Sequence, residues 1–172
     1  LFTVLTNAIE KYYSASGDFK LGTTMEGQLF DDLISYRNKD KDYLRDHCYR
    51  LKLPFQGPFR MGIICTQNDT PIKSSQIMNQ LRGRCPVDTY GIFLYKNKVA
   101  LVLKDWSGMD VKNLSVYDDN WKDLTTILKA NKAHIGLSLT LKDVSEFPVG
   151  YQQAGFSLKR GLDKDPGRVC YL

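Results

Sequence analysis

One stretch near the middle of the chain, residues 90–104, constrains the fold more than any other. It reads as two apolar strands joined by a tight turn at Lys96-Asn97-Lys98. Asn97 tolerates the positive φ angle that a tight hairpin turn requires. The second strand, residues 99–103, is apolar at every position, which predicts a central strand that is buried on both faces. We therefore expect a sheet that contains an antiparallel pair at this hairpin.

The segments around the hairpin alternate between extended and helical patterns. Before it, we expect a strand at residues 59–65 and a helix that begins at Asp69 or Thr70 and ends near Gly83. After it, we expect in turn a helix at 118–131, a strand at 133–138, a helical turn at 143–147, a helix with Pro148 in its first turn that ends at Gly161, and a strand at 168–172. This order predicts an α/β (α+β) fold with a mixed antiparallel and parallel sheet of about five strands and helices on its faces.

Three helical patterns precede the first expected strand and predict a leading helical layer. The second of them has a capping box at Thr23 and Glu26, and the third ends before Pro54. Their apolar stripes consist of Met25, Leu29, Leu33 and Tyr36 in the second helix and of Leu44, Cys48 and Leu51 in the third. We divide the chain into leading helices at 1–54, a possible dimerisation or signalling segment, and an α/β domain at 55–172.

The first helical pattern, residues 2–13, is the candidate for self-association. Its stripe falls at helical spacing and consists of Phe2, Leu5, Ile9 and Tyr12. The stripe can pack on the chain's own domain or pair with a second copy across a two-fold axis. Regulators that bind palindromic DNA need such two-fold pairing somewhere in the chain.

Charge and composition exclude several classes of function. The net charge is only +5, and the basic residues alternate with acidic ones instead of clustering as they do on a DNA-binding surface. No apolar run approaches the ~20 residues that span a bilayer, so we expect no membrane association and a cytoplasmic location. The cysteines show no close-spaced metal-binding pairs, and His47 and His134 are far apart in sequence; we expect buried reduced thiols at Cys48, Cys65, Cys85 and Cys170.

The order of elements and three motifs resemble the GGDEF-like domain of the sugar-diacid-regulator and purine-catabolism-regulator family of bacterial transcription factors. The motifs are the hairpin with its degenerate tip, the strand His134-Ile135-Gly136-Leu137-Ser138, and the helix start Phe147-Pro148-Val149-Gly150-Tyr151-Gln152-Gln153-Ala154. The helix that leads into the first strand, residues 44–51, is also similar. The resemblance covers residues 24–172 and implies a nucleotide-cyclase-like sheet with a ferredoxin-like core.

The resemblance also implies that this domain has lost its chemistry. An active diguanylate cyclase carries Gly-Gly-Asp/Glu-Glu-Phe at the hairpin, where the glycines admit the nucleotide and the acids hold Mg²⁺. The matching residues 95–99 contain neither glycine nor acid, and no acid ends the first strand at residues 64–67. We expect no catalysis, no metal and no cofactor. Lys96 and Lys98 are candidates for binding a phosphate without a metal; the alternative is a solvated hairpin tip.

In that family the domain lies between a sensory region and a C-terminal helix-turn-helix, which this chain does not show. We therefore interpret the chain as a piece of a longer protein, a reading that its first residue, Leu1, favours. The resemblance implies a signal-relay or dimerisation domain that forms a homodimer, reaches DNA only through the helix-turn-helix, and responds to a small-molecule effector sensed elsewhere. Two alternatives stay open: an allosteric sensor that binds a nucleotide or metabolite, and a ferredoxin-like enzyme with an unrecognised site.

Overall fold

A computed structural model describes residues 25–35, 40–66, 70–84, 89–104, 119–162 and 169–170. In chain order its elements are α2 (Met25–Ser35), α3 (Lys41–Leu51), β1 (Gln56–Thr66), α4 (Pro71–Gly83), β2 (Thr89–Tyr95), β3 (Lys98–Lys104), α6 (Asp119–Ala130), β4 (Ala133–Leu137), β5 (Leu141–Asp143), the 3-10 helix η2 (Val144–Glu146), α7 (Phe147–Gly161) and β6 (Val169–Cys170). The mixed α/β fold expected from the sequence is confirmed.

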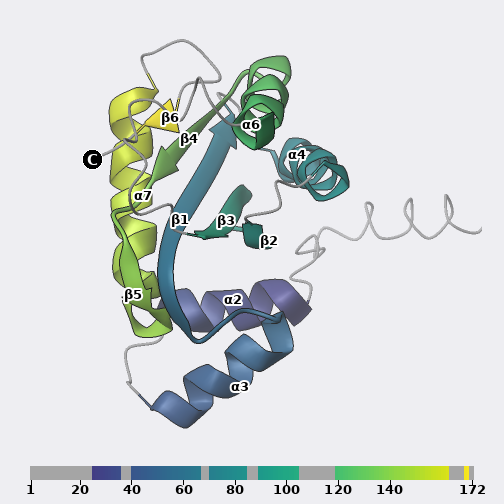
Figure 1. The fold of residues 1–172 in the computed structure, drawn as a ribbon. Coiled ribbons are helices and arrows are strands. Elements are labelled where there is room, and N and C mark those ends of the chain that lie inside the picture. Colours follow the sequence, from purple (N-terminus) through teal and green to yellow (C-terminus); the bar gives the residue numbers. More distant parts are fainter. Residues whose placement is uncertain are drawn as a thin grey trace, which may run out of the picture.

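The strands form one mixed sheet in the order β2-β3-β1-β4-β6, and β5 pairs with β1. β1 is antiparallel to β3, β4 and β5, whereas β4 and β6 are parallel. The expectation that residues 99–103 form a central strand is confirmed, because β3 lies between β2 and β1 and these five residues are buried. The long strand β1 therefore holds the sheet together (Figure 1).

Helices cover both faces of this sheet (Figure 1). On one face α4 and α6 bury a cluster that includes Ile77 and Leu128 against Ile64 and Leu101 of the sheet. On the other face α2 and α7 pack against the sheet, and the alternation of side chains along β1 sends Met61 to this side. The sheet is thus the middle layer of three, as expected when apolar strands need cover on two sides.

The leading helices share their core with the sheet. Phe30 of α2 stacks on Phe93 of β2, with ring centroids 4.5 Å apart. Leu44 and Cys48 of α3 belong to the same buried cluster, as do Phe59 of β1 and Phe147 of α7. The boundary expected between residues 54 and 55 stays a prediction, but within the described residues the core runs across it.

Local signals begin α3 and α4, and α4 begins where the sequence predicts. Thr70 is the N-cap of α4, where its Oγ1 accepts a hydrogen bond from the Lys73 N–H at 3.3 Å, and Pro71 occupies the first turn. Asp40 caps α3 by accepting from the Asp42 N–H at 3.0 Å. These caps satisfy backbone N–H groups that have no partner inside the helix.

Some local expectations are wrong. The described residues form a sheet of six strands, in line with the about five expected, but residues 141–143 form β5 where no strand was expected. Met25 is 65% exposed, so the buried face of α2 is turned towards Phe30, Leu33 and Ile34. The hairpin turn contains only Lys96 and Asn97, because Lys98 is already the first residue of β3.

Candidate functional site

The hairpin tip, where the resemblance would locate a catalytic site, is hydrogen-bonded to α4. Lys96 and Asn97 both have positive φ angles, 47° and 60°, as a two-residue turn of this kind requires. The Ser74 hydroxyl of α4 is buried and donates a hydrogen bond to the Asn97 carbonyl at 2.5 Å. Since Ile64 pairs with Val99, β1 ends beside this tip. The tip, the end of β1 and the first turn of α4 thus meet at one end of the sheet.

The charge at the tip comes from lysine. Lys96 is exposed, and its Nζ lies 5.0 Å from the centre of the Tyr95 ring. A hydrogen bond and a charge interaction with Tyr95 raise the pKa of Lys96 above its ordinary value, and Asp31 of α2 contributes to the same shift. The lysine therefore stays protonated at neutral pH, which opposes cation binding at the tip. Lys98 is half-buried and is the first residue of β3.

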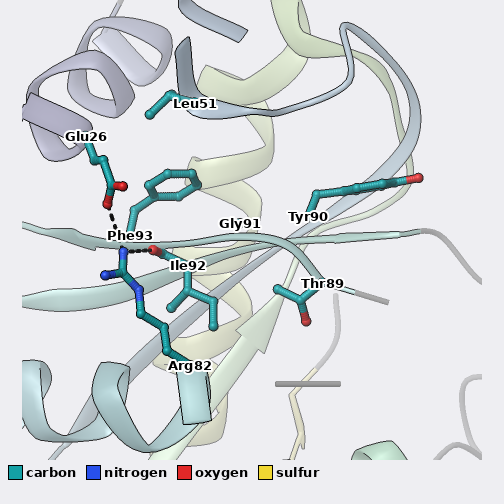
Figure 2. Close-up of a pocket in the computed structure, with 8 residues that line it drawn as sticks. All are labelled: Glu26, Leu51, Arg82, Thr89, Tyr90, Gly91, Ile92 and Phe93. Carbon is teal, nitrogen blue, oxygen red and sulfur yellow. Dashed lines mark hydrogen bonds and ion pairs between the residues drawn. The ribbon is translucent and has the colours of Figure 1, made fainter. Parts of the chain in front are cut away.

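A hollow in the described part of the molecule lies elsewhere, along the outer edge of β2 (Figure 2). It has a volume of about 420 Å³. Its lining comes from α2, α3, α4 and five consecutive residues of β2, and consists of Glu26, Leu51, Arg82, Thr89, Tyr90, Gly91, Ile92 and Phe93. Neither Lys96 nor Lys98 belongs to this lining. We call this hollow the β2 groove.

Two charged residues that line the β2 groove contact each other. The sequence pattern did not indicate either of them as a site residue. The Arg82 guanidinium contacts the Glu26 carboxylate at 2.9 Å and also donates to the Ile92 carbonyl at 3.1 Å (Figure 2). Glu26 was expected only as part of a capping box. The two residues are 56 positions apart, so no local spacing could have linked them.

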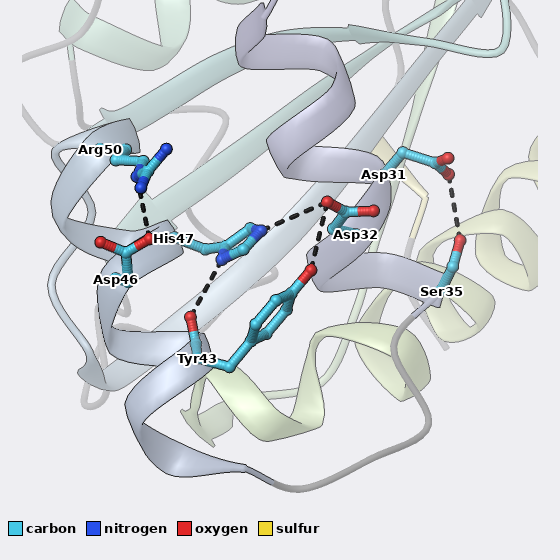
Figure 3. Close-up of polar contacts among 7 residues, drawn as sticks. All are labelled: Asp31, Asp32, Ser35, Tyr43, Asp46, His47 and Arg50. Atoms are coloured by element: carbon cyan, nitrogen blue, oxygen red, sulfur yellow. Dashed lines mark hydrogen bonds and ion pairs between the residues drawn. The ribbon is translucent and has the colours of Figure 1, made fainter.

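A second polar cluster joins α2 to α3 (Figure 3). The buried His47 ring contacts the Tyr43 carbonyl through Nδ1 at 3.0 Å and the Asp32 carboxylate through Nε2 at 3.3 Å. The Tyr43 hydroxyl donates to the same Asp32 oxygen at 3.4 Å. Both ring nitrogens face oxygen atoms of the fold, so neither faces a position for a nucleophile. We interpret the cluster as a polar link between the two helices.

The cysteines and the second histidine form no recognisable reactive centre. Cys48, Cys65 and Cys170 are buried and none of them is in a disulfide bond, as expected, and burial raises the pKa of the Cys48 thiol to about 11. His134 is 1% exposed, and neither of its ring nitrogens has a hydrogen-bond partner. In the described part of the chain, no three His, Cys, Asp or Glu residues are arranged to hold a metal ion. Cys85 lies outside the described residues.

Comparison of the chain with models of protein families, with curated proteins and with solved structures found no match. Within the described residues, no helix combines the length and the apolar character that crossing a bilayer needs. The proposed dimerisation residues lie outside the described residues; they are Phe2, Leu5, Ile9 and Tyr12.

Proposed function

We propose that the chain is a catalytically silent GGDEF-like domain of a bacterial transcriptional regulator. In this proposal the domain forms a homodimer and relays a signal between a sensor region and a C-terminal helix-turn-helix. The effector is sensed elsewhere in the full protein, and DNA is reached only through the helix-turn-helix.

One observation carries the proposal: the hairpin tip adjoins the end of β1, yet presents lysine where a cyclase needs acid. Cyclase chemistry needs carboxylates that hold Mg²⁺ against the nucleotide phosphates. The tip consists of Lys96 and Asn97, and β1 ends in Cys65 and Thr66. The Asn97 carbonyl is also engaged by Ser74, which ties the tip to α4. An arrangement of this kind supports a structural or relay role for the hairpin.

The test of silence is an assay with GTP and either Mg²⁺ or Mn²⁺. We expect no cyclic dinucleotide from the wild-type segment. A Lys96→Asp, Asn97→Glu double variant should also be inactive, because the end of β1 still lacks a carboxylate. An active cyclase in the same assay is the control which shows that the conditions support the reaction. Product that is formed by the wild type and lost on mutating the hairpin would refute the proposal.

The second candidate function is an allosteric sensor that binds a nucleotide or metabolite through Lys96 and Lys98. A thermal-shift screen with nucleotides and sugar acids separates it from the first. A ligand at 100 times its Kd adds about 2.7 kcal/mol to the free energy of unfolding, which a melting curve detects readily. A shift that disappears in a Lys96→Ala, Lys98→Ala variant would favour the sensor over the relay domain.

A further inference from the structure

The outer edge of β2 carries backbone groups that pair with no strand of the described sheet. β2 is the end strand of the described sheet. Tyr95 and Lys98 flank the two-residue turn, so they exchange both hydrogen bonds of their pair. Bonded and non-bonded pairs alternate along an antiparallel ladder, so Ile92 and Leu94 direct their N–H and C=O groups away from β3. Such an edge is a template for one more strand.

The Arg82 side chain already binds to this strand edge. Its guanidinium donates to the outward-facing Ile92 carbonyl at 3.1 Å, which is where the N–H of an added strand would bind. Its other contact is the Glu26 carboxylate, and the two side chains are 46% and 57% exposed. A salt bridge this exposed contributes little to stability, so an incoming ligand can replace it at low cost.

The β2 groove has the shape of a slot for a single extended chain. Glu26 and Leu51 lie on one side of the strand edge and Arg82 on the other (Figure 2). At Gly91 the Phe93 ring fills the space that a side chain would need, since a Cβ there would lie 2.5 Å from that ring. Walls on both sides admit one peptide strand more readily than the sheet edge of a second copy, which would carry its own overhanging helices.

We propose that the β2 groove binds an extended peptide segment with apolar side chains at alternate positions and an acidic side chain near Ile92. The peptide backbone pairs with Ile92 and Leu94, and it displaces Arg82 from the Ile92 carbonyl. The displaced guanidinium then needs an acceptor, which the acidic side chain supplies. Leu51 and Phe93 receive the apolar side chains on the α2 side. This inference rests on the β2 groove alone and is independent of the proposed relay function.

The test uses a probe with fluorescein on its N-terminus, fluoresceinyl-Thr-Val-Glu-Val-Glu-Val-Thr-amide, and its Gln-for-Glu counterpart. By fluorescence anisotropy, we expect the wild type to bind the Glu peptide roughly tenfold more tightly than the Gln peptide, because only a carboxylate makes a charge-assisted bond with Arg82. In Arg82→Ala the two peptides should bind alike. Arg160→Ala makes the same change of charge on α7, away from the β2 groove, and should keep the preference of the wild type.

Two further measurements keep the test decisive. Glu26→Gln frees Arg82 from its internal partner and should strengthen binding of the Glu peptide, so the proposal can be examined even if Arg82→Ala folds poorly. Hydrogen exchange at the Ile92 and Leu94 amides should slow only when peptide is bound. The proposal is overturned if neither peptide binds at millimolar concentration, if the wild type shows no preference, or if these amides are protected without peptide in a dimer seen by sedimentation, which would make a second copy the occupant.

Discussion

At the scale of single residues, α7 lies very close to the sheet at Gly136 of β4. A Cβ added there would collide with the Ala154 carbonyl and with Leu158 of α7, and backbone cannot move aside as a flexible side chain can. Gly136→Ala should therefore lower the free energy of unfolding by about 1–3 kcal/mol in urea unfolding experiments. Gly83→Ala is the matched control, since a Cβ at that position meets nothing within 4 Å. The control should change stability by less than about 1 kcal/mol, on the stabilising side; equal losses in both variants would contradict the tight packing of α7 on β4.

Tyr151 of α7 gives the second residue-scale prediction. Burial, and after it the neighbouring Tyr95, raises the pKa of the Tyr151 hydroxyl from 10.0 to about 12. Between these values the unfolded chain has lost this proton while the folded chain keeps it, so the unfolded state binds fewer protons. The contribution of Tyr151 is therefore fully present below pH 10 and is lost as the pH rises through about 12. We compare urea unfolding midpoints from neutral pH to about pH 11. The midpoint of Tyr151→Phe should decrease less over this range than that of the wild type. Parallel curves for the two proteins would show that the environment of Tyr151 has no such effect.

At the scale of elements, β3 is a central strand of the sheet and is buried at residues 99–103. Leu101 is 2% exposed, and β3 has neighbours on both sides. Leu101→Asp should unfold the domain, because a buried unpaired carboxylate costs several kcal/mol against a whole-domain stability of ~5–15 kcal/mol. The control Leu139→Asp changes a side chain that is 54% exposed and should leave the circular dichroism spectrum and melting temperature nearly unchanged. A folded Leu101→Asp protein would mean that β3 is not buried as described.

The order of the elements was predictable from the sequence. A short strand that depends on pairing with a distant part of the chain was not. The hairpin, the α4 cap at Thr70 and the proline at the start of α7 are local signals, and each fixes the element that carries it. β5 has only three residues, and it exists because Leu141 pairs with Phe59 of β1, which is a contact between distant parts of the chain. The face of α2 was misjudged at Met25 for the same reason, since the position of the sheet decides which side of a helix is buried.

The candidate sites also differ in whether they depend on local sequence or on contacts between distant parts of the chain. The lack of acid at the hairpin tip is plain from residues 95–99, but the β2 groove depends on α2, α4 and β2 meeting in space. Arg82 and Glu26 carry no motif of their own. The role of Arg82 at the edge of β2 can be recognised only when the position of that edge is known.

At the scale of the whole molecule, the open question is self-association. The stripe at Phe2, Leu5 and Ile9 predicts that the first helical pattern pairs with a second copy, because an isolated helix of about 12 residues is marginal in water and needs packing. Deleting residues 1–16 should convert a dimer to a monomer in sedimentation velocity runs. Leu5→Asp should have the same effect, while Asn7→Asp, on the other side of the helical pattern, should not. If the truncated protein keeps its oligomeric state and only melts earlier, the segment belongs to its own core; if the intact segment is a monomer at high concentration, the dimer proposal fails.

The central position of β1 has a consequence for how the protein is made. Among the strands of the described sheet, β1 leaves the ribosome before the others, whereas its neighbours β3 and β4 are synthesised later, and β4 begins only at Ala133. At ~5–20 residues per second, a long apolar strand therefore waits for seconds without its partners. During that interval α2 and α3, which come earlier in the chain and share a cluster with β1, are the cover already available. Variants that weaken these two helices should therefore increase aggregation during synthesis more than their effect on the finished protein would suggest.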